Sequence, residues 1–118
     1  MNHYSFIVKI VREAGELLLK LRDDGFTATH KGENFRNIVT SVDIAVNEFI
    51  VGKIRESFPD DVIYSEEDSG LNSTGVNTWA IDPIDGSSNF ARGIPHYAVC
   101  IAHLVGGAPD AGAVFNPV

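Results

Sequence analysis

Apolar residues recur at helical spacing along the start of the chain. The intervals of four and three are those of one face of an α-helix, and they run through Ile7, Val11, Ala14, Leu18 and Leu21. The pattern predicts an amphipathic helix of roughly residues 3–23, whose main task is packing. Asp24-Gly25 is expected to end it.

A second helical pattern opens at Thr40. Thr40 as N-cap with Asp43 three residues later resembles a capping box, with Asp in place of Glu. The apolar face of this helix would comprise Val42, Val46, Phe49, Ile50 and Ile54. Asp43 therefore has a sufficient structural explanation as a first-turn acid favoured by the helix dipole.

The rest of the pattern favours short strands and loops. We expect a short strand near residues 27–31, a loop over residues 32–37, and short buried strands at residues 62–65 and 79–81, the second stopping abruptly at Asp82. Residues 97–105 and 111–118 should form a hairpin across a connection of residues 106–110.

Composition narrows the class of protein. The 118 residues suffice for one small domain, and the net charge of −7 argues against a nucleic-acid surface. Cys100 is the only cysteine, so no intrachain disulfide can form, and its apolar surroundings suggest a buried thiol. The four histidines share no metal-ligand spacing and read as ordinary surface or core residues. We see neither a signal-peptide pattern nor a stretch of membrane-spanning length, so we expect a cytoplasmic protein without a membrane partner.

The acids are unevenly distributed. No Lys or Arg lies between Arg55 and Arg92, yet this interval holds half of the 16 acids. Such a block could be solvated surface, a disordered tail or a cation site. Apolar runs inside it argue against the tail.

The segment of residues 82–87, here called the acidic corner, has the clearest chemical content. Its carboxylates, Asp82 and Asp85, suit a hard cation such as Mg²⁺. Between them, Pro83 would hold the turn rigid and the Ile84 carbonyl could be a further ligand. Gly86 then allows close backbone approach, and the N–H groups at a fresh helix start could bind phosphate. In isolation the same letters also fit an ordinary turn with Asp85 or Ser87 as a helix cap.

Four motifs in register resemble the inositol monophosphatase family of Mg²⁺-dependent phosphatases. Residues 82–90 match its D-P-[IL]-D-G-[ST]-x-N-[FY] signature, residues 39–43 its V-T-x-x-D, and residues 112–118 its G-V-V-Y-x-P-V strand. Residues 65–67 match its G-E-E segment, with Ser65 replacing Gly. The resemblance covers nearly the whole chain and implies an α+β fold, a layered αβ sandwich of helices and sheets.

The resemblance also implies roles. It assigns the metal ligands to Glu66, Asp82, Ile84 and Asp85, the catalytic roles to Asp43, Glu66 and Ser87, and substrate or phosphate binding to Asp85, Gly86 and Ser87. In this scheme Asp82 bridges two metals, and Ser87, paired with Asp43, orients a metal-activated water. Glu67 stays outside the metal shell. The complete enzyme would hold two or three Mg²⁺ ions.

The implied function is Mg²⁺-dependent hydrolysis of a small phosphate monoester on a polyol or sugar. Inositol monophosphate is the default substrate; fructose 1,6-bisphosphate and nucleotide 3′-phosphates are the alternatives within the family. A homodimer is implied for the full-length form. A calcium-binding structural module is a further alternative, against which no EF-hand spacing appears.

One part of the family pattern is missing. The family's domain is roughly twice this length, and its second half carries a W-D-x-A-type motif whose Asp completes the second metal site. Trp79 is the only tryptophan here and is followed by Ala80. We therefore expect residues 1–118 to be the N-terminal metal- and phosphate-binding half of a phosphatase domain. The alternative from another class is a catalytically inactive homologue that serves as a binding or regulatory module.

Overall fold

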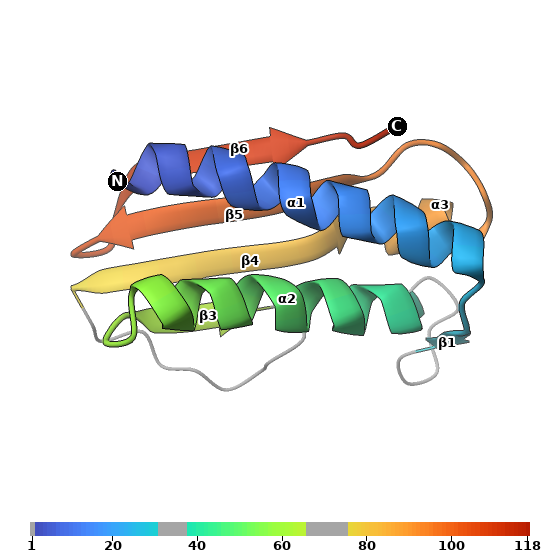
Figure 1. The fold of residues 1–118 in the computed structure, drawn as a ribbon, viewed down its shortest axis with the longest axis horizontal. Helices are drawn as coiled ribbons and strands as arrows, with labels where there is room; N and C mark the ends of the chain where they lie inside the picture. Colours follow the sequence, from blue (N-terminus) through green and yellow to red (C-terminus); the bar gives the residue numbers. More distant parts are fainter. Residues whose placement is uncertain (1, 31–37, 66–75) are drawn as a thin grey trace.

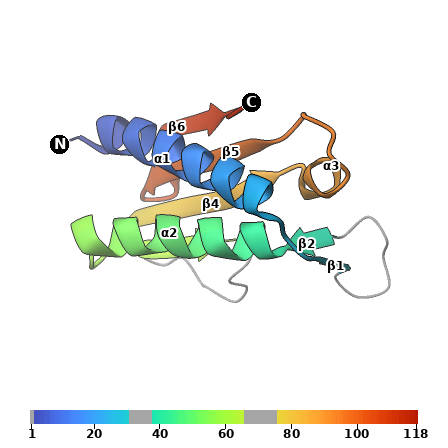
Figure 2. The ribbon, with the colours of Figure 1, turned by 45° about the vertical axis from the view of Figure 1, so that its right-hand side comes forward.

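A computed structural model describes residues 2–30, 38–65 and 76–118. The elements follow in the order α1 (His3–Asp24), β1 (Ala28–His30), β2 (Ile38–Thr40), α2 (Ser41–Ser57), β3 (Val62–Ser65), β4 (Asn77–Asp85), α3 (Ser87–Ala91), β5 (Ala98–Val105) and β6 (Ala108–Phe115). Four strands form a sheet in the order β3-β4-β5-β6, and β1 pairs with β2 in a separate ribbon. Helices α1 and α2 lie side by side on one face of the sheet (Figures 1 and 2). This is the α+β arrangement predicted from the sequence.

Both long helices form where the apolar pattern predicts them. Helix α1 is capped by Asn2, whose side chain accepts from the Ser5 amide at 2.7 Å, and it ends at Gly25 with φ of 96°. Its apolar stripe, including Ile7, Val11 and Leu18, is buried against β5 and β6. Helix α2 opens on the expected capping box of Thr40 and Asp43 and packs on β4.

The sheet is mixed, and its two faces differ. Strand β3 runs parallel to β4, whereas β4, β5 and β6 are antiparallel neighbours. Side chains of alternating residues such as Trp79, Ile81 and Ile101 are buried beneath the helices. The opposite face carries half-buried or exposed residues, among them Asp82, Cys100 and Val114, and no helix of the described residues covers it.

The strand boundaries require three corrections. Strand β4 does not stop at Asp82 but continues to Asp85. The hairpin turn is only Gly106-Gly107, with φ of 57° and 83°, so residues 108–110 belong to β6 rather than to the connection. Two residues at positive φ suit a tight hairpin, and Pro109 is tolerated because β6 is an edge strand. The short strand β2 was not predicted, because its three residues are too few to show a period.

No helix among the described residues is long and apolar enough to cross a membrane.

Candidate functional site

The two carboxylates of the acidic corner lie at an irregularity in β4. Asp82 pairs with Cys100 and Asp85 pairs with Ala98, so three steps on β4 oppose two on β5. In a regular strand, Asp82 and Asp85 would point to opposite faces. The extra residue of the bulge instead brings both acids onto one face of the sheet, because the two residues of β5 that pair with them lie on the same, open face. Pro83, which cannot donate to the ladder, sits within this irregularity.

The same bulge turns Ile84 inward. Its side chain is buried in the core under the helices, whereas Asp85 is exposed and Asp82 is half-buried. The corner is thus anchored by an apolar side chain and presents carboxylates on its other side. Sequence alone suggested a strand that ends at Asp82; the physical arrangement is a strand that bulges and continues.

Burial and both carboxylates affect the pKa of Cys100. Burial, followed by the negative charges of Asp82 and Asp85, raises the pKa of the half-buried thiol to about 11. Cys100 is therefore not the fully buried thiol expected from its apolar run. Its thiolate is disfavoured first by burial and then by the negative potential of the two acids.

Gly86 connects the bulged strand to the short helix α3. It adopts φ of 93°, and a Cβ at this position would come within 2.9 Å of the His96 carbonyl oxygen. Both the backbone conformation and the contact therefore require glycine. No side chain caps the start of α3.

A hydrogen-bond chain links this corner to the first turn of α2. The Ser87 hydroxyl lies 2.5 Å from Asp43 Oδ1 and 2.9 Å from the Ile84 carbonyl oxygen. Asp43 is almost completely buried, and its other oxygen, Oδ2, accepts from the Thr40 amide at 2.8 Å. The contact between Ser87 and Asp43 is the one that the family resemblance implies. It brings together residues that lie far apart in the sequence.

A hollow of about 410 Å³ opens beside the corner. Asp85, Gly86, Asn89, His96 and Tyr97 contribute to its lining, with Asn116 from the end of the chain. The Asn89 side-chain amide donates to the His96 carbonyl at 2.9 Å, and the Arg22 guanidinium donates to the Tyr97 hydroxyl at 3.2 Å. Sequence analysis did not single out His96, Tyr97 or Asn116, because only the return of β5 and β6 brings them to the corner.

The donor set at the corner fits a hard divalent cation. Asp82, Asp85 and the Ile84 carbonyl offer only oxygen atoms, which Mg²⁺ prefers. After burial, the negative charges of Asp82 and Asp85 contribute to the raised pKa of Cys100 at this end of the sheet. Glu66, to which the resemblance assigns a metal-ligand role, and its neighbour Glu67 lie outside the described residues, as does the loop predicted over residues 32–37.

One polar pair replaces a feature of the family pattern. Ser65, where the pattern has Gly, is fully buried and donates its hydroxyl to the side-chain carbonyl of Asn47 on α2. A buried hydroxyl needs such a partner. A serine at the end of a predicted buried strand was the available signal, but the sequence could not identify Asn47 as its acceptor.

Known proteins resemble this chain over nearly its whole length. The model of the inositol monophosphatase family matches residues 2–118. The protein named Nus factor SuhB of Escherichia coli K12 is 38% identical over 114 residues, covering 94% of this chain and 42% of that protein. The fructose-1,6-bisphosphatase/inositol-1-monophosphatase of Thermotoga maritima is 35% identical over 117 residues, covering 99% of this chain and 44% of that protein.

Solved structures show the same fold. An extragenic suppressor protein suhB from Bartonella henselae superposes with a TM-score of 0.86 at 26% identity, covering 96% of this chain and 44% of that one. An IMPase from Thermotoga maritima gives a TM-score of 0.84 at 34% identity, with coverages of 96% and 43%. The chain thus spans less than half the length of the relatives it matches.

Proposed function

Because the chain belongs to the inositol monophosphatase family, a family of phosphatases, we propose that its acidic corner serves the Mg²⁺-dependent hydrolysis of a small phosphate monoester. The observation that carries the proposal is the bulge in β4. It sets Asp82 and Asp85 on one face of the sheet, directly before the glycine that starts α3. An acid pair beside exposed helix-start amides suits a cation and a phosphate together.

The proposed metal ligands are Asp82, Asp85, the Ile84 carbonyl and Glu66. Mg²⁺ bound there would neutralise the phosphate charge and lower the pKa of a coordinated water. The single Ser87 hydroxyl proton is donated toward Asp43 Oδ1, so the Ile84 carbonyl oxygen, 2.9 Å from the Ser87 hydroxyl, keeps lone-pair capacity for a cation. Without a cation, this set of acids would repel an anionic substrate.

The remaining roles fall to side chains and amides of the corner. The Ser87 hydroxyl donates toward Asp43 Oδ1, so the Asp43 carboxylate can receive a proton passed through Ser87 from the attacking water. The amides of Gly86 and Ser87 would hold phosphate oxygens. Asp85, the most exposed member, would contact a hydroxyl of the substrate alcohol.

We propose inositol monophosphate as the default substrate. The name of the Thermotoga relative couples inositol-1-monophosphatase with fructose-1,6-bisphosphatase, so fructose 1,6-bisphosphate is the first alternative and a nucleotide 3′-phosphate the second. Each is a small phosphorylated alcohol. We also propose, as the family resemblance implies, that a full-length form is a homodimer.

The test is phosphate release from these substrates, with and without Mg²⁺. Asp82→Asn keeps the shape of the side chain and removes its charge, and it should abolish the activity. Asp60→Asn, at an exposed acid beyond the end of α2, is the matched control and should leave turnover unchanged. Wild-type turnover in Asp82→Asn would rule out the metal-bridging role.

The names of several relatives favour a second candidate function. Proteins called Nus factor SuhB match at 36–38% identity, so a regulatory role that does not need hydrolysis is the alternative. It predicts that Asp82→Asn abolishes phosphate release but preserves the regulatory phenotype in cells that depend on the protein. Loss of both together would favour the enzymatic role alone.

A further inference from the structure

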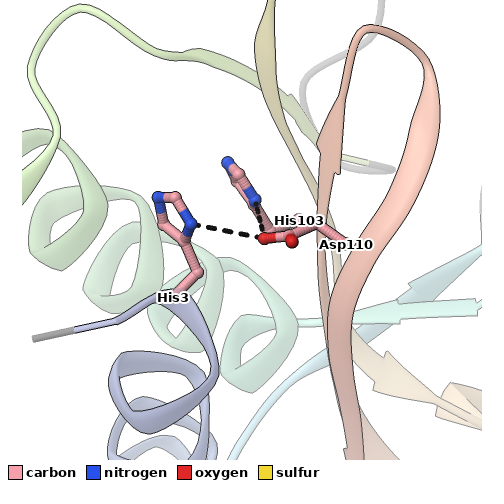
Figure 3. A group of neighbouring side chains, drawn as sticks. All are labelled: His3, His103 and Asp110. Atoms are coloured by element: carbon pink, nitrogen blue, oxygen red, sulfur yellow. Dashed lines mark hydrogen bonds and ion pairs between the residues drawn. The ribbon is translucent and has the colours of Figure 1, made fainter.

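Three potential metal ligands meet at the end of the sheet where α1 begins (Figure 3). His3 Nδ1 lies 3.3 Å from Asp110 Oδ2, and His103 Nδ1 lies 2.8 Å from the same oxygen. One ligand atom from each residue can be chosen so that all lie within 4.8 Å of one another. Both imidazoles thus direct the same type of nitrogen toward one carboxylate oxygen.

Three separate elements build this cluster. His3 is the first residue of α1, His103 lies in β5 and Asp110 lies in β6. The ladder of β5 and β6 shifts register here: His103 pairs with Ala111, whereas Leu104 pairs with Pro109. Asp110 is therefore the extra residue of a bulge, a feature that re-aims a side chain. The bulge is what brings the carboxylate to the buried histidine.

The surroundings hold the buried His103 ring in place. The imidazoles stack with centroids 3.7 Å apart, and the His103 ring lies 4.6 Å from the indole of Trp79. His103 is fully buried, while the side chains of His3 and Asp110 are 32% and 40% exposed. The cluster is therefore rigid at its base and open to solvent at its rim.

Core packing alone does not account for His103. Among the described residues, its Nε2 is the single buried side-chain nitrogen or oxygen without a hydrogen-bond partner. An unsatisfied buried polar atom is rare in a folded protein and calls for an explanation. An apolar side chain would fill this position without that cost, so the imidazole is retained for what its Nδ1 does.

We propose that His3, His103 and Asp110 form a binding site for a borderline transition-metal ion of the Zn²⁺ class. Two imidazole nitrogens and a carboxylate are a donor set that suits Zn²⁺ or Ni²⁺ and not Mg²⁺, which selects oxygen ligands. In a tetrahedral zinc site with bonds of about 2.0–2.2 Å, neighbouring ligand atoms lie about 3.3–3.5 Å apart. The observed separations of 2.8 and 3.3 Å are somewhat shorter than this, and the partly exposed His3 ring, which is stacked on His103, would turn to direct its Nδ1 at the ion. Solvent can supply the remaining ligand.

This site is independent of the acidic corner. The turn between β5 and β6 and the start of α1 lie at one end of the sheet, whereas the end of β4 and α3 lie at the other (Figure 1). The two sites also differ in donor chemistry. A metal bound at the cluster would tie the start of α1 to the β5–β6 hairpin and stabilise the folded chain by binding only to it.

Trp79 provides a local probe, because it is the only tryptophan and lies 5.7 Å from the His3 ring as well. Paramagnetic Ni²⁺ should quench its fluorescence in a saturable 1:1 titration in excess Mg²⁺, and Zn²⁺ should reverse the quenching. His3→Gln and Asp110→Asn alter partly exposed side chains and should each weaken binding at least about tenfold, since loss of even an outer-shell partner costs about 10- to 100-fold.

Matched controls separate this cluster from other ligands. His30→Gln and Asp24→Asn remove an exposed histidine and an exposed acid elsewhere, and Asp82→Asn disables the acidic corner; all three should bind Ni²⁺ like the wild type. Circular dichroism should show that every variant is folded. Quenching that fails to saturate, or wild-type affinity in both His3→Gln and Asp110→Asn, would overturn the proposal.

Discussion

Asp43 uses its two carboxylate oxygens for different purposes. Oδ2 accepts from the Thr40 amide and so caps α2, while Oδ1 accepts from the Ser87 hydroxyl. The first contact is local and could be predicted from the spacing of Thr40 and Asp43. The second joins residues 44 positions apart. Only the family resemblance suggested it, because no local pattern encodes a contact at that distance.

The role proposed for Ser87 predicts a selective loss of activity. Ser87→Ala removes the hydroxyl that donates toward Asp43 and should lower kcat by about 10²- to 10⁴-fold, the range of general acid–base catalysis, with a smaller change in KM. Ser88→Ala is the matched control, because the Ser88 hydroxyl contacts the exposed Arg92 at 2.6 Å instead. Equal kcat values for the two variants would contradict the role of Ser87.

Cys100 reports on the charge of the acidic corner. Its pKa of about 11, against an ordinary value of 9.0, leaves roughly 100-fold less thiolate at pH 8. Alkylation by iodoacetamide should therefore be slow at pH 8, and Asp82→Asn should accelerate it. Asp60→Asn should not. If Asp82→Asn left the rate unchanged, Asp82 would not supply the negative potential.

The same shift has a consequence for stability. A raised pKa in the folded state favours the protonated thiol. The contribution of this thiol to folding stability is therefore present below about pH 9, where the unfolded thiol is also protonated. This contribution to stability is lost as the pH rises through about 11.

Asp110 shows the opposite sign: hydrogen bonding from His103, with the charges of His103 and His3, lowers its pKa. Its contribution is present above the ordinary carboxyl pKa and is lost as the pH falls through the lowered value.

At the scale of elements, α1 packs closely on the end of β6 at Gly15. A Cβ built there would lie 2.6 Å from Phe115 Cε2 and 3.1 Å from Pro117 Cβ. Glycine inside a helix costs about 1 kcal/mol relative to alanine, so its presence has a packing reason here. The apolar period predicted which face of α1 is buried. It could not predict that β6 would require a residue without a side chain.

This contact predicts opposite effects for two glycine substitutions. Gly15→Ala overpacks the interface, which typically costs about 1–3 kcal/mol, and should lower the free energy of unfolding despite the gain in helix propensity. Gly52→Ala, in α2 with nothing within 4 Å of the new Cβ, should raise it by about 1 kcal/mol. Urea unfolding of both variants provides the measurement. Equal stabilisation by both would show that α1 does not pack on Phe115 as described.

The strands contain features that the sequence pattern could not predict. Short apolar runs located β3, the start of β4 and the two strands of the hairpin, but they gave no sign of the bulges at residues 82–85 and at Asp110. A bulge adds one residue without changing the composition of a strand. Both candidate sites of this protein depend on such a bulge. The residues of the acidic corner could be found in the sequence, but their arrangement could not. The cluster of His3, His103 and Asp110 was missed altogether, because the histidines share no metal-ligand spacing along the chain.

At the scale of the whole molecule, one face of the sheet is covered and the other is not. The helices bury one face, while the other carries a broad hollow of about 680 Å³ lined by Tyr64, Ala80, Asp82, Cys100, Ala102 and Val114. Strand β6 is an edge strand, and Val114 is 74% exposed. The sequence predicted a hairpin of residues 97–105 and 111–118. The order of the four strands could not be derived, because local patterns do not encode which strands pair.

The chain spans 42–44% of the length of the curated relatives named above. The acidic corner nevertheless lies wholly within the described residues, whereas the proposed ligand Glu66 does not. The proposed phosphate site should therefore be testable by binding, whether or not these 118 residues support turnover. A binding test thus examines the geometry of the corner without requiring catalytic turnover.

The most direct test of the account is an NMR titration of the 118-residue chain with inorganic phosphate in the presence of Mg²⁺. The account predicts that the amide resonances of Gly86 and Ser87 shift saturably, that the shifts need Mg²⁺, and that Asp82→Asn abolishes them while Asp60→Asn does not. Shifts confined to other residues, or identical shifts in Asp82→Asn, would contradict a metal and phosphate site at the acidic corner.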